Sequence, residues 1–236
     1  MSTTASPVPG VAAGTTTGTR PASRRSRARL IERRVGALLL AAAGLAMGAG
    51  GMLHPHGSGD TLDEALGSML GSSMWGLSHV LVLTGIVIGV AGFVLVRRSG
   101  ALDAVCPWIT VVIVAWALAA IETLPHLLAG AEHAAHAAGE ATPMTDAHLT
   151  LSVFTTPLMA FTTAILAVQL ARRARTALAW ILAAFAIAGA LTFGIASPLL
   201  ALTGDPAMSA LFPGQLLIDV WLIGTAVRLW APPRSN

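Results

Sequence analysis

The chain has 236 residues, of which 55% are hydrophobic and only 11% charged, whereas a soluble globular domain carries about 25% charged residues. This composition excludes an ordinary soluble domain, and a single Cys excludes a domain held together by internal disulfide bonds. The formal net charge is +3, but the basic residues form short separate clusters rather than one basic domain. We therefore expect no nucleic-acid partner.

Residues 1–34 consist mainly of Ser, Thr, Ala, Pro, Gly and Arg. Such a segment has too little apolar surface to form a core, so the sequence predicts a disordered cytoplasmic tail. The Arg residues between positions 24 and 34 are expected to contact anionic lipid headgroups, at about 1 kcal/mol per residue.

Six apolar runs follow the tail, at 35–53, 75–96, 105–128, 149–171, 177–202 and 214–230. A helix needs about 17–25 residues to cross a bilayer, and each run reaches that length. The sequence therefore predicts an all-α integral membrane protein, with a bundle of six transmembrane helices over 35–230 and a short cytoplasmic tail at 231–236.

The positions of Arg predict the orientation of this bundle. Clusters precede the first run and follow the second, fourth and sixth, and Arg concentrates on the cytoplasmic side of membrane proteins. Both termini are thus expected in the cytoplasm, with the chain in the cell (plasma) membrane. In an alternative interpretation the first run is a cleaved signal peptide, which leaves five helices in unchanged orientation.

The first outer loop contains a helix signal of its own. Thr61 and Glu64 match a capping box, in which the Thr side chain and the Glu side chain each bind the other residue's backbone N–H. Apolar residues then recur at helical spacing up to Leu70. This pattern predicts a short amphipathic helix over 62–70 that lies at the outer interface and covers whatever the helix ends enclose.

All seven histidines fall on the outer side under this topology. His54 and His56 follow the first run, His79 lies about one turn inside the second, and His126 and His148 flank the second outer loop. That loop contains His133 and His136. Imidazoles from four helices are therefore expected at nearly the same depth. Trp75, just before His79, is the residue type that anchors a helix at the membrane interface.

Glu122 is the most informative single residue, because an acid inside a membrane span is costly and usually faces the bundle interior with a partner. His126, one turn later, is the expected partner. If the helix continues into the loop, His133, His136 and Glu140 share the same face. Asp219, five residues into the last run, is expected near the interface and in contact with water.

Imidazole and carboxylate are ligands for transition metals and, in the case of His, for haem. We therefore expect a site for Zn, Cu or haem at His54, His56, His79, Glu122, His126 and His148, with His133 and His136 as weaker candidates. Transport, sensing and electron transfer are all compatible with such a site. Two alternatives stay open: a structural membrane subunit without a ligand, and a zinc-dependent membrane hydrolase. The sequence names no protein partner and does not decide whether the protein is an enzyme.

Overall fold

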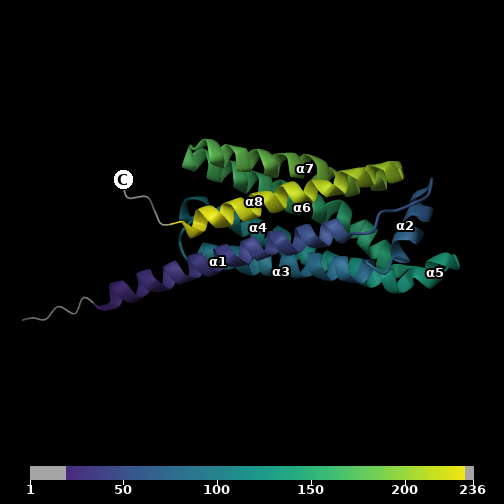
Figure 1. Ribbon diagram of the computed structural model, residues 1–236, viewed down its shortest axis with the longest axis horizontal. Coiled ribbons are helices and arrows are strands. Elements are labelled where there is room, and N and C mark those ends of the chain that lie inside the picture. Colours follow the sequence, from purple (N-terminus) through teal and green to yellow (C-terminus); the bar gives the residue numbers. More distant parts are fainter. Residues whose placement is uncertain (1–19, 232–236) are drawn as a thin grey trace, which may run out of the picture.

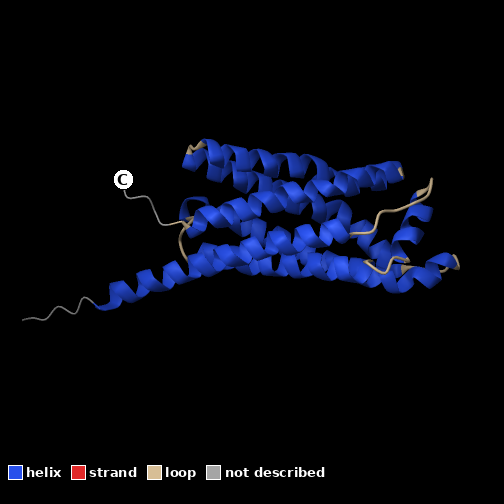
Figure 2. Ribbon diagram, viewed as in Figure 1, coloured by secondary structure: helices blue, strands red, loops and turns tan. Residues whose placement is uncertain are grey.

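The computed structural model describes residues 20–231, which form helices joined by short connections and contain no β-strand (Figures 1 and 2). In chain order, the elements are α1 (Arg20–Leu53), α2 (Leu62–Leu70), α3 (Trp75–Arg98), η1 (Asp103–Val105), α4 (Cys106–Ala129), η2 (Gly130–Glu132), α5 (His133–Ala137), α6 (Pro143–Ala174), α7 (Ala177–Thr203), η3 (Pro206–Gly214) and α8 (Gln215–Trp230).

Six helical segments are long and apolar enough to cross a membrane, as the apolar runs predict. They are Arg25–Leu53, Trp75–Arg98, Asp103–Ala137, Pro143–Ala174, Ala177–Thr203 and Pro206–Trp230. The α6 helix begins six residues before the predicted run, with Pro143 in its first turn. A proline is well placed there because the first turn has no use for its missing N–H.

The start of α1 differs from the sequence prediction. Disorder is predicted up to residue 34, but the helix begins at Arg20; residues 1–19 lie outside the described part. Arg, Ala, Leu and Glu dominate positions 24–34, and all are good helix formers. The Glu32 Oε1 atom forms an ion pair with Arg98 Nη2 of α3 at 3.3 Å. The Arg34 guanidinium lies 5.4 Å from the Trp230 ring centre. These contacts bind the last turns of this segment to the bundle.

The six long helices form a closed ring. In chain order α1 packs on α3, α3 on α4, α4 on α6, α6 on α7 and α7 on α8, and α8 returns to pack on α1. Short connections make neighbours antiparallel, so the ends of α1 and α8 that bear Arg lie together. Figure 1 shows α2 and α5 at the opposite end of the bundle.

Small residues let α1 and α3 approach closely. A Cβ atom on Gly85 would lie 2.9 Å from the carbonyl oxygen of Ala43, and one on Gly92 would lie 3.1 Å from that of Gly36. Such contacts are typical of membrane helices, which gain little from apolar burial and depend on close packing. The middle of the bundle is filled by buried side chains, among them Trp116 and Trp221. The cavity described below lies nearer the α2 end.

Candidate metal centre

A cavity of about 510 Å³ opens inside the bundle at the end where α2 lies. Its lining comes from almost every helix, with Met47 of α1, Thr156 of α6, Phe193 of α7 and Gln215 of α8 facing it. Residues of α2, including Leu66, form one wall. The short capped helix therefore covers the space that the long helices enclose, as the sequence predicts.

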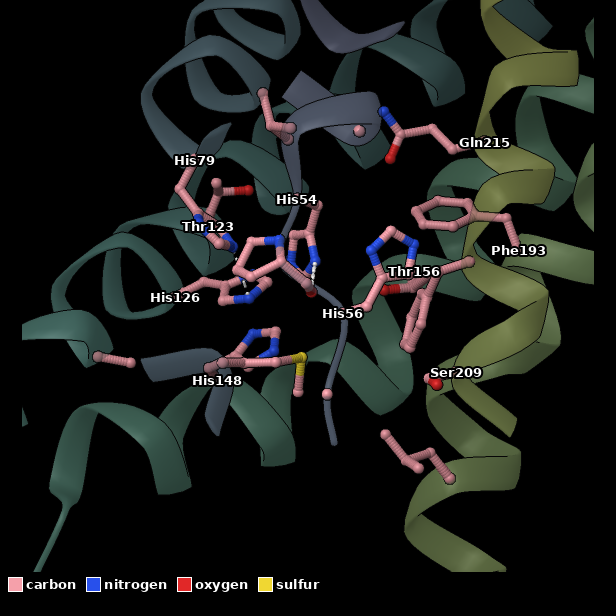
Figure 3. A pocket seen from close by; sticks show the side chains of 18 of the residues that line it. His54, His56, His79, Thr123, His126, His148, Thr156, Phe193, Ser209 and Gln215 are labelled. Atoms are coloured by element: carbon pink, nitrogen blue, oxygen red, sulfur yellow. Dashed lines mark hydrogen bonds between the residues drawn. The ribbon is translucent and has the colours of Figure 1, made fainter. Parts of the chain in front are cut away.

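Four histidines converge on one side of this cavity (Figure 3). His54 comes from the segment after α1, His79 from the first turns of α3, His126 from the last turns of α4 and His148 from the first turns of α6. Antiparallel neighbours in the ring bring these ends to one depth, which is why residues far apart in sequence meet. Glu122 joins them from α4, one turn before His126.

The donor atoms of these residues fall into two overlapping groups. One consists of His54, His79 and His126, the other of Glu122, His126 and His148, and within each group the potential ligand atoms lie within 4.8 Å of one another. The Nε2 atoms of His79 and His126 are 2.9 Å apart, and the rings of His126 and His148 stack with centres 3.5 Å apart. His126 belongs to both groups and stands at the middle of the cluster.

Hydrogen bonds fix the tautomer of three of the imidazoles. His79 Nδ1 donates to the Trp75 carbonyl oxygen at 2.6 Å, and His54 Nδ1 donates to the Pro55 carbonyl oxygen at 2.9 Å. His148 Nδ1 donates to Glu122 Oε1. Because carbonyl and carboxylate oxygens accept, each ring carries its proton on Nδ1 and its lone pair on Nε2. The Nε2 atom of His79 faces that of His126. Metal-binding histidines are held in this way in many proteins.

The partner of Glu122 differs from the one expected. His126 lies one turn away on the same helix, but the hydrogen bond runs to His148 on α6. The Glu122 side chain is only 8% exposed and that of His148 is 16% exposed, so the pair is largely removed from water. A buried acid and a buried imidazole that hydrogen-bond to each other lower the cost of burial for both.

Burial and charge favour neutral imidazole at His54. Burial lowers the pKa of His54 below its ordinary value, the hydrogen bond to the Pro55 carbonyl opposes this, and the neighbouring His148 lowers it further. A metal binds the neutral ring, so this environment keeps the ligand available.

Trp75 has a different place from the interface position expected for it. The side chain is 5% exposed, and its ring stacks on that of His79 with centres 4.2 Å apart. Its Nε1 donates to the Leu127 carbonyl oxygen at 3.3 Å. Trp75 thus supports His79 with both its ring and its carbonyl group. A tryptophan as such does not indicate that it supports a histidine. The spacing of four residues between Trp75 and His79 does, because it places the Trp75 carbonyl group one helical turn before the ring.

The remaining histidines lie apart from the two groups. His56 is exposed and lines the cavity, where Figure 3 shows it across from the cluster. His136 Nε2 contacts the Asp63 carbonyl oxygen at 3.1 Å, and His133 lies against Gly71. The helical chain continues past Ala129 through η2 and α5, as expected if His133 and His136 share a face with Glu122. There, however, both histidines face α2 and hold it over the end of the bundle.

Comparisons with known proteins give no further guide to this site: no protein-family model, no curated protein and no solved structure matches the chain.

Proposed function

We propose that this protein is a multi-pass membrane protein that binds a transition-metal ion, Zn²⁺ or Cu²⁺, in its outward-facing half. The observation that carries the proposal is the convergence of four histidines and one acid in two donor groups that share His126: His54, His79 and His126 in one, and Glu122, His126 and His148 in the other. In three of these rings Nδ1 donates to an oxygen acceptor, so that the lone pair lies on Nε2.

The donor set supports an ion of intermediate softness. Imidazole nitrogen suits Zn, Cu, Fe and Ni, whereas Mg²⁺ and Ca²⁺ prefer a shell of oxygen ligands. Two Nε2 atoms bound to one tetrahedral Zn²⁺ at about 2.05 Å are roughly 3.3 Å apart. The His79–His126 separation of 2.9 Å needs only a small outward movement of the rings to reach that value.

The same spacing argues against haem between two of these histidines. A haem with two axial imidazoles places the whole macrocycle between their Nε2 atoms, roughly 4 Å apart across the iron at metal–nitrogen distances of about 2 Å. Here the rings of His126 and His148 stack directly, with centres 3.5 Å apart. A single ion fits between the donor atoms without separation of the helices.

We propose the orientation of the bundle in the membrane from the difference between its two ends. Arg34, Arg98 and Arg228 lie at the end opposite the cluster, in agreement with a cytoplasmic position for that end and for both termini. The packing of α1 along α3 and α8 supports retention of the first helix rather than its cleavage as a signal peptide. The histidines then face outward, where an ion arrives from outside the cell, and the Arg residues of the N-terminal segment lie near anionic lipid headgroups.

Metal content of the purified protein tests the proposal. The wild type, extracted in mild detergent and supplied with Zn²⁺ or Cu²⁺, is expected to retain one ion as measured by elemental analysis. His126→Ala removes the central ligand and abolishes retention. Glu122→Gln weakens the acceptor that orients His148, and loss of such a supporting group costs about 10–100-fold in affinity.

His133→Ala is the matched control, because this exposed histidine lies outside both donor groups and its loss leaves metal retention unchanged. A Soret band in the visible spectrum would show that the bound group is haem and not a single metal ion. A folded wild type that retains neither ion nor haem, even after incubation with Zn²⁺ and Cu²⁺, would refute the proposal and favour a structural subunit.

A further inference from the structure

A second acid is buried in the bundle, away from the histidine cluster. Asp219 of α8 is 3% exposed, although its place near the start of the last apolar run predicts contact with water. Both of its carboxyl oxygens are buried and have no hydrogen-bond partner among the described residues.

The surroundings of Asp219 are helix backbone and apolar side chains. The carbonyl oxygen of Asp219 would lie 2.9 Å from a Cβ atom on Gly44, and its Oδ2 atom 3.6 Å from one on Gly48. The carboxyl group is therefore held between α8 and the bare glycine face of α1.

Within residues 20–231, neither carboxyl oxygen of Asp219 has a cationic partner that could balance a charge. The spanning part of α1 from 35 to 53 and all of α7 contain no ionisable side chain, and those of α6 lie toward its ends. On α8 itself the next charged group, Arg228, is nine residues away, on the order of 13 Å along the helix axis. An unpaired carboxylate is strongly disfavoured in such a place, so the resting form is the neutral acid with its proton.

Asp219 nevertheless lies next to the cavity. Gln215, one turn earlier on the same face of α8, interacts with the Asp219 carboxyl group without hydrogen-bond geometry. The Gln215 side chain lines the cavity and donates to the Met47 carbonyl oxygen at 3.4 Å. Figure 3 shows Gln215 facing the same space as His54 and His56. The Gln215 amide thus connects the acid with the lining of the cavity.

We propose that Asp219 is a proton-binding site of the bundle: a carboxylic acid that holds one proton between α1 and α8 and exchanges it with water in the cavity past Gln215. On release, the O–H bond of the acid breaks, a cavity water takes the proton and Asp219 is left as the carboxylate. On uptake, the carboxylate recovers a proton from the same water. The proposal does not depend on metal binding, because Asp219 belongs to neither donor group.

Infrared spectroscopy of the purified protein at neutral pH tests both the protonation of Asp219 and the exchange of its proton with water. The wild type is expected to show the C=O band of a protonated carboxylic acid, and this band should shift when H₂O is replaced by D₂O. Asp219→Asn, which has nearly the same shape, abolishes the band. Asp146→Asn, which changes an exposed acid in the first turn of α6, is the matched control and keeps the band.

Gln215→Leu tests the exchange route and should slow the D₂O shift while the band stays. Asp219→Glu guards against a folding defect in the Asn variant, since it should restore a protonated-acid band at a displaced frequency. Absence of the band in a folded wild type would show that Asp219 is ionised and would overturn the proposal. A band that is present but does not exchange in D₂O would identify a purely structural acid and would overturn it equally.

Discussion

Gly130 leaves room for the Trp75 ring, which in turn supports His79. A Cβ atom at this position would lie 2.4 Å from Cδ1 and 2.9 Å from Nε1 of the Trp75 ring, which itself stacks on His79. Gly130→Ala must displace the indole, and such overpacking costs about 1–3 kcal/mol. We expect Gly130→Ala to lower metal affinity although no ligand is changed, as measured by isothermal titration with Zn²⁺.

Gly76→Ala serves as the matched control for this variant. It lies next to Trp75 on α3, and nothing stands within 4 Å of an added Cβ atom. Ala is a better helix former than Gly by about 1 kcal/mol, so this variant should be at least as stable as the wild type and bind metal equally well. Equal affinity in both variants would show that the position of Trp75 does not affect the site.

The lowered pKa of His54 predicts how stability depends on pH. Burial keeps the folded-state pKa below the unfolded value of about 6.5. Between these two values the unfolded chain binds more protons, so the folded state loses stability as pH falls below about 6.5. His54→Asn should reduce this loss, measured by thermal unfolding of the metal-free protein above and below that pH. An unchanged pH profile in this variant would contradict burial of a neutral His54.

At this scale the sequence predicted which residues meet but not how they bind each other. Spacing from the helix ends placed His54, His79, His126 and His148 at one depth, and the structure brings them together. The Glu122–His148 bond was missed because it depends on which helices are neighbours in the ring, and one helix alone shows only the i+4 partner. The buried position of Asp219 was missed for the same reason, since the glycine face that covers it belongs to α1.

Among the helices, α2 offers a test of how much a capping box stabilises a short helix. Glu64 N–H donates to Thr61 Oγ1 at 3.2 Å, and Thr61 N–H donates to Glu64 Oε2 at 3.1 Å. Thr61→Ala removes the first bond and costs about 1 kcal/mol of local helix stability. We expect faster amide hydrogen exchange over residues 62–70 in this variant, with metal retention preserved.

Thr142→Ala is the matched control, because Thr142 precedes α6 in the same cap position but its side chain makes no capping hydrogen bond. Exchange in α6 should not change. The α2 helix should also loosen in acid, because backbone N–H groups of Asp60 and Thr61 lower the pKa of Glu64, and its cap is lost as pH falls through that lowered value. Equal exchange over 62–70 in wild type and Thr61→Ala would rule out a contribution from the cap.

For the molecule as a whole, the Arg distribution predicts on which side each loop lies. The single Cys106 is first replaced by Ser, and one new Cys is then placed at an exposed position near one end of the bundle. Labels that do not cross membranes should react in intact cells with Cys at Asp60, Ala141 or Ala207, but with Cys at Ala101 or Ala177 only after the cells are opened. Reaction at Ala101 in intact cells would reverse the orientation and place the histidines inside.

The sequence predicted the number of long helices because length and hydropathy are properties of each segment alone. It did not predict that α8 closes the ring on α1, since ring closure depends on packing of small residues from distant segments. The helical extension of α1 back to Arg20 was missed because its polar composition resembles a disordered tail, whereas its contacts with Arg98 and Trp230 lie elsewhere in the chain.

If the histidine cluster binds a metal as proposed, the short contact between the Nε2 atoms of His79 and His126 would give the site a selectivity of its own. Since His79 already carries its proton on Nδ1, the proton in this contact belongs to His126 Nε2. An incoming ion must displace that proton before it gains the nitrogen, so every ion competes with an internal hydrogen bond. In the proposed site, weak imidazole binders such as Mg²⁺ and Ca²⁺ would lose that competition to ions that bind imidazole strongly.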